Sequence, residues 1–262
     1  MHCLAGKPNR AAFHSRAPMR REATLELVHT DVCYVDAPSD RGGQYFVTFI
    51  NDFSKKLWAF MLKSKDQVLS VFKEFHASVE RISRQKLKVV RTDNGGEYRG
   101  QFEMYGKPQD IELEYKVPKT PELNGLAKRM NQSIMERLKS MLSHAKLPKS
   151  YWVEAMLTTV YLINRSPSVP LKGDVPQRVW TRRNVSYQQL RLLRCLAYMH
   201  VAKYQRSKLD RKSSHAYSWG TQKMSLATCC GISLIKGGTE PKTGNNKKQP
   251  HLPSRLLSWS RH

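Results

Sequence analysis

The chain of 262 residues lacks a long hydrophobic run. No apolar segment reaches the ~18–20 residues that a membrane-spanning helix needs, and residues 1–21 are basic and polar, without the apolar stretch of a secretory signal. Its five cysteines are scattered and odd in number, so they indicate no disulfide framework and suit a reducing compartment. We therefore expect neither a membrane protein nor a secreted, disulfide-stapled domain.

Acidic side chains are also scarce. The chain has 21 Asp and Glu against 45 Lys and Arg, a formal charge of +24. Residues 23–150 are nearly balanced, with 21 basic and 16 acidic side chains, whereas residues 201–262 carry 12 and 2. A pI near 10 is typical of a protein that binds nucleic acid. A solvated basic tail without a specific partner is the alternative that charge alone leaves open.

Hydrophobic patterning predicts an α/β protein. The hydrophobic fraction of 40% is below the usual 45–50% but still allows a core. The order β-β-β-α-β-α-β-α-α predicts a mixed sheet with helices on its faces, although the stretch between the last two strands is poorly patterned. A further strand over 193–201 is possible, and the chain from about residue 220 has the composition of a disordered tail. The predicted strands are 25–35, 44–53, 56–63, 86–93 and 111–117, and the clearer helices are 65–83, 126–145 and 152–163.

Two aspartates stand at informative places in these strands. Asp31 lies in or at the end of the first apolar strand, and Asp93 ends the strand KVVRTD. Carboxylates on neighbouring strands can meet at one edge of a sheet, where they could hold a pair of Mg²⁺ ions that promote phosphoryl transfer. The alternative is that both residues only cap or turn the chain.

Five sequence blocks then become informative together. They are HTDVC at 29–33, YFVTFINDFS at 45–54, RTDNGGEY at 91–98, TPELNGLA at 120–127, and the stretch from Tyr151 to Pro167. Their order and spacing resemble the integrase core of copia-type LTR retrotransposons, over about residues 3–216. The resemblance implies an RNase H-like fold and a polynucleotidyl transferase with an Asp, Asp, Glu triad and Mg²⁺ or Mn²⁺. It also implies the element's DNA ends and target DNA as substrates.

The resemblance assigns the first two triad acids to Asp31 and Asp93, but the third is missing. The family motif Asn-Gly-x-Ala-Glu-Arg reads Asn-Gly-Leu-Ala-Lys-Arg at 124–129, so Lys128 replaces the glutamate. An ammonium offers no lone pair to a metal and repels it. We therefore expect a weakened metal site and impaired catalysis. Glu122, in a Pro-flanked loop, and Glu136, about 80° around the helix, are poor substitutes.

The same helix offers candidate DNA contacts. A lysine can bind a phosphate as a point charge, so DNA binding can survive the loss of the acid. The candidates are Asn124, Lys128, Arg129 and Lys139, with a solvated face as the alternative reading.

The resemblance divides the chain into four parts. Residues 1–22 correspond to a remnant of the zinc module and linker that precede the core, residues 23–167 to the catalytic core, and residues 168–216 to a post-core extension. Of the two His and two Cys of that zinc module only Cys3 matches, with His2 beside it, so we expect no zinc.

Residues 217–262 form the fourth part, and we infer a frameshifted tail from about residue 217. The family continues with segments like I-F-x-G-Y and G-Y-x-L-W-D, whereas this chain reads YSWGTQKMSLATCCGI at 217–232. With suitable codons, reading one nucleotide earlier gives I-F-L-G-Y-A-E-D-E-F-G-Y-L-L-W-D. Without this part the chain still has 38 basic and 20 acidic side chains, a charge of +18.

The sequence thus predicts a retrotransposon integrase core with DNA as partner, impaired catalysis and possible homo-oligomers. We expect it in the nucleus if functional and in the cytoplasm otherwise. A non-catalytic DNA-binding protein and a non-functional remnant, both derived from such a core, are the alternatives.

Overall fold

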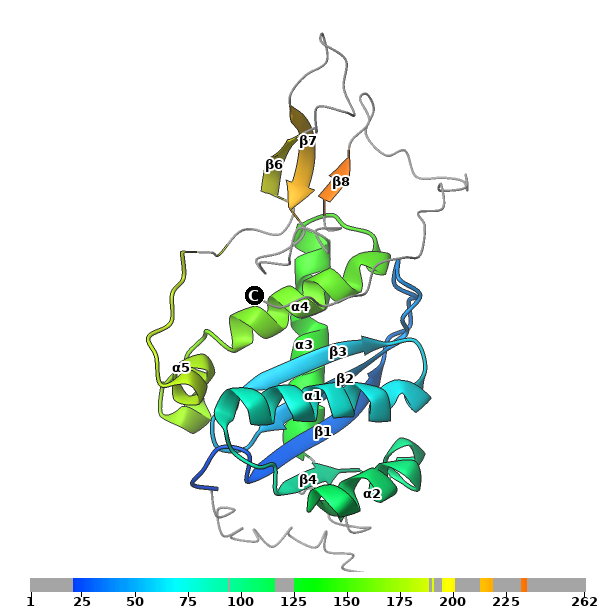
Figure 1. The fold of residues 1–262 in the computed structure, drawn as a ribbon. Coiled ribbons are helices and arrows are strands. Elements are labelled where there is room, and N and C mark those ends of the chain that lie inside the picture. Colours follow the sequence, from blue (N-terminus) through cyan, green and yellow to red (C-terminus); the bar gives the residue numbers. More distant parts are fainter. Residues whose placement is uncertain are drawn as a thin grey trace, which may run out of the picture.

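The computed structural model describes residues 21–93, 95–115, 125–188 and 190, together with three strands beyond them. Figure 1 shows a sheet crossed and flanked by helices. The strands are β1 (Leu27–Tyr34), β2 (Tyr45–Asn51), β3 (Leu57–Leu62), β4 (Val89–Thr92), β5 (Glu112–Tyr115), β6 (Cys195–His200), β7 (Ser213–Ser218) and β8 (Ile232–Leu234). The helices are α1 (Val68–Ser83), α2 (Gln101–Gly106), α3 (Gly125–His144), α4 (Trp152–Ile163) and α5 (Pro176–Thr181), and a 3₁₀ turn spans Gly96–Tyr98.

The main sheet has the order β3-β2-β1-β4-β5. β1, β2 and β3 are antiparallel neighbours, joined by the short connections that the sequence predicts, while β4 and β5 run parallel to β1. A parallel neighbour needs a crossover, and α1 supplies it between β3 and β4. The predicted RNase H-like fold, a mixed five-stranded sheet flanked by helices, is confirmed.

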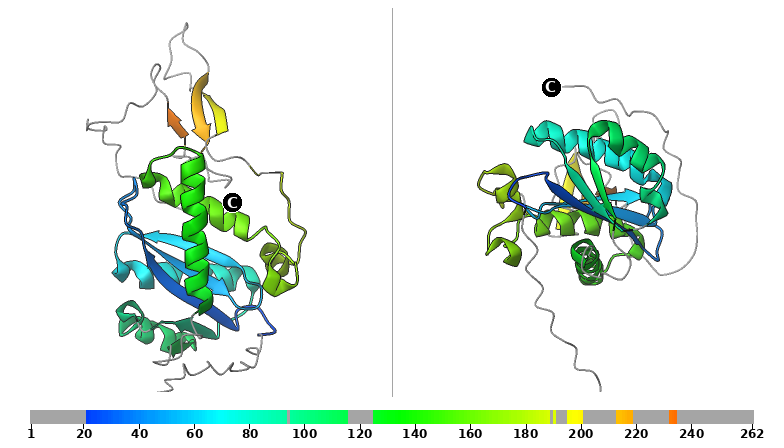
Figure 2. Two further views of the ribbon diagram at one scale, coloured as in Figure 1. Left: turned by 180° about the vertical axis from the view of Figure 1, so that it is seen from behind. Right: turned by 90° about the horizontal axis from the view of Figure 1, so that it is seen from below.

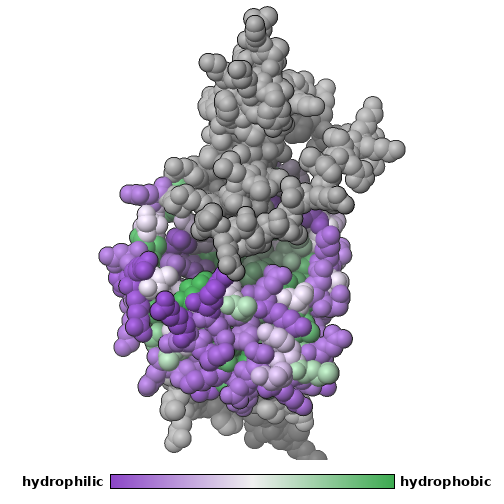
Figure 3. Space-filling view, viewed as in Figure 1, coloured by the Kyte–Doolittle hydropathy of each residue, from purple (hydrophilic) through white to green (hydrophobic). Residues whose placement is uncertain are grey.

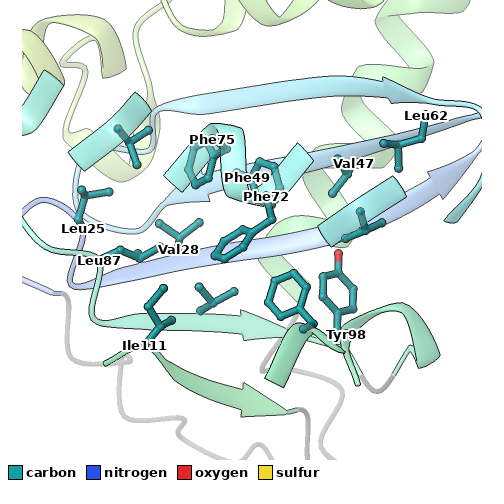
Figure 4. Close-up of a cluster of buried hydrophobic side chains, with 14 residues drawn as sticks. Leu25, Val28, Val47, Phe49, Leu62, Phe72, Phe75, Leu87, Tyr98 and Ile111 are labelled. Atoms are coloured by element: carbon teal, nitrogen blue, oxygen red, sulfur yellow. The ribbon is translucent and has the colours of Figure 1, made fainter. Parts of the chain in front are cut away.

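One face of the sheet packs against α1 and α2. The helical spacing of apolar residues in 65–83 directs one side of α1 onto this face, where Phe49 of β2 stacks on Phe75 with ring centroids 4.3 Å apart. Figure 4 shows these side chains between strands and helix. Tyr98, which follows β4, closes the end of the cluster and is fully buried.

The opposite face packs against α3 and α4. Figure 2 shows α3 crossing the strands from behind, and the view from below places the sheet between the two helical layers. Trp152 at the start of α4 is 1% exposed and lies 6.2 Å from Phe46 of β2, measured between ring centroids. This second cluster fixes α3 across the strand that carries Asp31.

The apolar residues that recur at helical spacing in 126–145 all pack against this second cluster: Leu126, Met130, Ile134, Leu138 and Met141. The most buried side of α3 is slightly offset from that stripe and consists of Ala127, Asn131, Ile134, Leu138 and Leu142. The helix is turned so that a polar residue, Asn131, occupies the interface. Its partner is a carboxylate on β1, which an apolar pattern cannot reveal.

The three C-terminal strands form a second sheet in the order β6-β7-β8. β6 lies within the possible strand 193–201, β7 crosses residue 217, and β8 lies within the expected tail. The rest of 217–262 lies outside the described residues, as do Cys3, His2 and the other residues of the proposed zinc remnant before Arg21.

The surface is mostly hydrophilic over the described part of the face drawn in Figure 3, with smaller hydrophobic areas between. Within the described residues, no helix combines the length and the apolar character needed to cross a bilayer.

Candidate active site

The parallel register of β1 and β4 brings the two predicted acids together. Leu27 pairs with Val89 and His29 with Arg91, so the same register sets Asp31 of β1 beside Asp93, which directly follows β4. Asp31 is 6% exposed, and its strand partner on the other side is Thr48 of β2.

Asp31 is held from α3. The side chain of Asn131 donates from Nδ2 to Asp31 Oδ2 at 3.0 Å, and its Oδ1 accepts from Thr48 Oγ1 at 2.8 Å. Burial raises the pKa of the Asp31 carboxyl to about 6, and the charge of Asp93 adds to this, while Lys128 and the Asn131 hydrogen bond oppose it. Asp31 is therefore a buried acid with a fixed orientation.

Asp93 faces two donors. Its Oδ1 accepts from the backbone N–H of Gly95 at 3.1 Å, and its Oδ2 lies 3.9 Å from Lys128 Nζ at the start of α3. The Lys128 side chain is 54% exposed and that of Asp93 28%. The three positions assigned from the sequence therefore lie together, with an ammonium beside the carboxylates.

The sequence reasoning missed two neighbours of this pair, Asn131 and Glu97. The Glu97 charge contributes to the raised pKa of Asp31, its Oε1 lies 3.6 Å from Lys65 Nζ, and its side chain is 9% exposed. A Cβ on Gly95 would come within 2.7 Å of the Glu97 carboxyl, so glycine leaves room for this acid. A polar residue one turn after Lys128, and an acid four residues after Asp93, were the signals available.

Tyr98 anchors the segment that carries Glu97. Its hydroxyl forms a buried hydrogen bond of 2.9 Å with Thr30 Oγ1 on β1, and its backbone carbonyl accepts from Tyr115 Oη at 2.9 Å. The chain after Asp93 is thus tied to both neighbouring strands.

The donor set does not fit a divalent-metal centre. Across residues 21–93, 95–115 and 125–188, no three His, Cys, Asp or Glu side chains are grouped closely enough to hold a metal. Asp31 Oδ2 and Asp93 Oδ1 accept hydrogen bonds from the protein, and Lys128 places a positive charge 3.9 Å from Asp93 Oδ2.

Of the two possible substitute acids, Glu136 does not reach the site. Glu136 is exposed and accepts from Gln132 Nε2 at 3.1 Å on the outer side of α3, and Glu122 lies outside the described residues.

The candidate DNA-binding residues are exposed along α3 where the structure describes them. Arg129 donates from Nε to the carbonyl of Gly125 at 3.0 Å, and Lys139 is exposed eleven residues after Lys128, on the same side of the helix. Asn124 lies outside the described residues.

The sequence was compared with family models and with known proteins. No family model matches the chain. It is 52% identical over 214 residues to the retrovirus-related Pol polyprotein from transposon TNT 1-94 of Nicotiana tabacum, covering 81% of this chain and 16% of that protein. With the Pol polyprotein from transposon RE1 of Arabidopsis thaliana it shares 32% over 228 residues, covering 87% and 15%. The chain thus spans about one sixth of the length of these relatives.

Among solved structures, the fold is similar to a chain of the simian T-cell lymphotropic virus intasome in complex with the PP2A regulatory subunit B56 gamma. The TM-score is 0.52 at 14% identity, with coverage of 77% of this chain and 72% of that one. This likeness concerns the fold alone.

Proposed function

Because the chain belongs to the retrovirus-related Pol polyproteins of plant copia-type transposons, we propose that it is their integrase core, with DNA binding retained and metal-dependent DNA joining largely lost. The observation that carries the proposal is the ion pair of Lys128 with Asp93, beside the buried Asp31. The fold orients the two acids, whereas the ammonium takes the place of the third acid. A divalent cation then binds weakly, because it meets a fixed positive charge.

DNA binding is the part of the function that the substitution spares. The chain carries +24, and Lys128, Arg129 and Lys139 present positive charge at exposed positions of α3. Phosphate contacts of this kind give affinity without reading sequence. We propose that both element ends and target DNA bind here, and that homo-oligomers assemble on the DNA.

The substitution Lys128→Glu tests the proposal through metal binding. We expect Mg²⁺ or Mn²⁺ to raise the melting temperature of Lys128→Glu and to leave that of the wild type nearly unchanged, since stabilisation follows site occupancy. A concentration tenfold above Kd gives about 1.4 kcal/mol. The double variant Lys128→Glu, Asp93→Asn is the control and should lose the response.

An activity assay then separates impaired from active protein. A labelled DNA end is incubated with a supercoiled target plasmid and Mn²⁺, and joined product is counted for wild type and Lys128→Glu. We expect product only with the glutamate. Joining by the wild type that Asp93→Asn abolishes would show that the lysine is compatible with catalysis and overturn the proposal.

The second candidate is a DNA-binding protein without chemistry, favoured by the same Lys128–Asp93 ion pair. This candidate would be favoured if the wild type and Lys128→Glu both bind DNA in a salt-dependent way. Lys128→Glu would then bind the metal but would not join DNA.

A further inference from the structure

Two cations meet at the end of the main sheet, away from the acidic pair. Lys56 immediately precedes β3, and Arg165 follows α4 more than a hundred residues later. In Figure 1, α4 runs towards α5 next to β3. Both side chains are half-buried, so water screens the repulsion between their charges only in part.

Two hydrogen bonds of Asn164 hold together the segments that carry Lys56 and Arg165. Asn164 Oδ1 accepts from the backbone N–H of Leu57 at 2.9 Å, and Asn164 Nδ2 donates to the Leu57 carbonyl at 2.7 Å. The clamped residues are the chain neighbours of Arg165 and Lys56. Gln177 adds to the clamp, since its backbone N–H donates to the Asn164 carbonyl at 2.9 Å and its Oε1 accepts from Lys56 Nζ.

The two cations have no acidic partner among residues 21–93, 95–115 and 125–188. Asp52, four residues before Lys56, is engaged by Lys55 at 2.7 Å, and Asp174, three residues before Gln177, by Arg178 at 2.6 Å. Burial, and secondarily the charge of Arg165, lowers the pKa of Lys56 to about 8. Two like charges are thus held near each other with no carboxylate partner in the described part of the chain, which costs stability.

Aromatic rings line the pair. The guanidinium of Arg165 stacks 3.5 Å from the ring centroid of Tyr161, and Lys56 Nζ lies 5.8 Å from that of Trp58. Arg165 Nε is buried and has no hydrogen-bond partner in the described part of the chain. The guanidinium is thus held by stacking and has one donor without an acceptor, and the Arg165 side chain as a whole is only half-buried.

We infer that Lys56 and Arg165 form a binding site for a phosphate group. A guanidinium offers paired N–H donors to two phosphate oxygens, and the ammonium adds a point charge. A phosphate group has several oxygens and at least one negative charge. It therefore suits the paired donors of Arg165 and the charge of Lys56 better than a single neutral acceptor does. The source is either nucleic-acid backbone or free phosphate, and the site is separate from Asp31 and Asp93.

The test compares two variants with the same loss of charge. Lys56→Met removes the proposed ligand, and Lys63→Met removes an exposed lysine just after β3 that forms no ion pair within the described residues. Melting temperatures are measured at pH 7 in sodium phosphate and in sodium chloride of equal ionic strength. This arm does not depend on the proposed function, because it uses no DNA.

We expect phosphate to raise the melting temperature of the wild type and of Lys63→Met by a few degrees, and to leave Lys56→Met unchanged. In chloride, Lys56→Met should melt higher than the wild type, because the repulsion with Arg165 is gone. Arg165→Gln provides the same comparison if Lys56→Met does not fold.

A second arm identifies the source by fluorescence anisotropy of a labelled duplex oligonucleotide. If the site binds nucleic-acid backbone, Lys56→Met lowers affinity about 3–10-fold relative to Lys63→Met, as expected for one phosphate contact. A phosphate response in the first arm alone points to free phosphate. The inference is overturned if Lys56→Met matches Lys63→Met in both arms.

Discussion

At the scale of single residues, the raised pKa of Asp31 means that this carboxyl contributes less stability at neutral pH than in mild acid. Burial raises that pKa to about 6, so the folded protein binds a proton that the unfolded chain has already released. The contribution of Asp31 to the free energy of unfolding therefore falls as pH rises from about 4 to 6 and stays low above that.

Asp31→Asn removes this penalty. We expect the variant to gain about 1–3 kcal/mol in the free energy of unfolding at pH 7.5, since each pKa unit corresponds to about 1.4 kcal/mol. It should also lose part of the decline between pH 4 and 6. Urea titrations at several pH values measure both effects. Asp36→Asn, at an exposed aspartate, is the matched control and should leave the dependence of the free energy of unfolding on pH unchanged. Equal curves for Asp31→Asn and the wild type would contradict this account.

The sequence could predict the acids but not how they are held. Asp31 and Asp93 follow from strand ends and motif spacing, and Lys128 from its place in the motif. The bond between Asn131 and Asp31 joins residues a hundred positions apart. Nothing in local periodicity connects such residues, because that contact depends on how α3 is turned against the sheet.

At the scale of elements, Asn164 ties the end of α4 to the start of β3. Its side chain makes both hydrogen bonds to Leu57 and is 4% exposed. We expect Asn164→Ala to lower the free energy of unfolding by about 2–4 kcal/mol, because two buried backbone groups lose their partners. Asn184→Ala, at an exposed asparagine, should change it by less than about 0.5 kcal/mol.

Chemical denaturation of both variants measures the difference. A loss of less than about 0.5 kcal/mol for Asn164→Ala would mean that water replaces the clamp, which would also weaken the case for a fixed Lys56–Arg165 pair.

The strands and the long helices were predictable, whereas the bounds of the six-residue helices were not. The expected strands 25–35, 44–53 and 56–63 match β1, β2 and β3 within a few residues, because alternation and apolar runs extend over their full length. α2 and α5 have six residues each, less than two turns. Such helices carry too few positions for periodicity, and packing against the sheet decides them.

At the scale of the whole molecule, the described residues of both hydrophobic clusters lie between Leu25 and Trp180. The second sheet, β6-β7-β8, forms its strand pairs within itself. Stability of the main sheet should therefore not depend on the chain beyond residue 190.

A chain shortened to end at residue 190 tests this. We expect cooperative thermal unfolding within about 2 °C of the full chain, a shift that corresponds to less than about 1 kcal/mol. A chain ending at residue 148 lacks α4 and Trp152. It should lose the cooperative transition, because the second hydrophobic cluster is then missing its α4 residues and is exposed to water. A large loss for the longer of the two would show that the second sheet contributes to the core.

The ammonium beside Asp93 has a consequence for the history of the gene. Lysine and glutamate codons differ at a single base, so a glutamate at position 128 is always one mutation away. Yet restoring it returns a third negative charge to Asp31 and Asp93 and removes the cation that now balances them. Each such revertant begins as a less stable protein wherever magnesium is scarce. The replacement of glutamate by lysine therefore needs only one base change, and selection for folding alone is enough to keep the lysine.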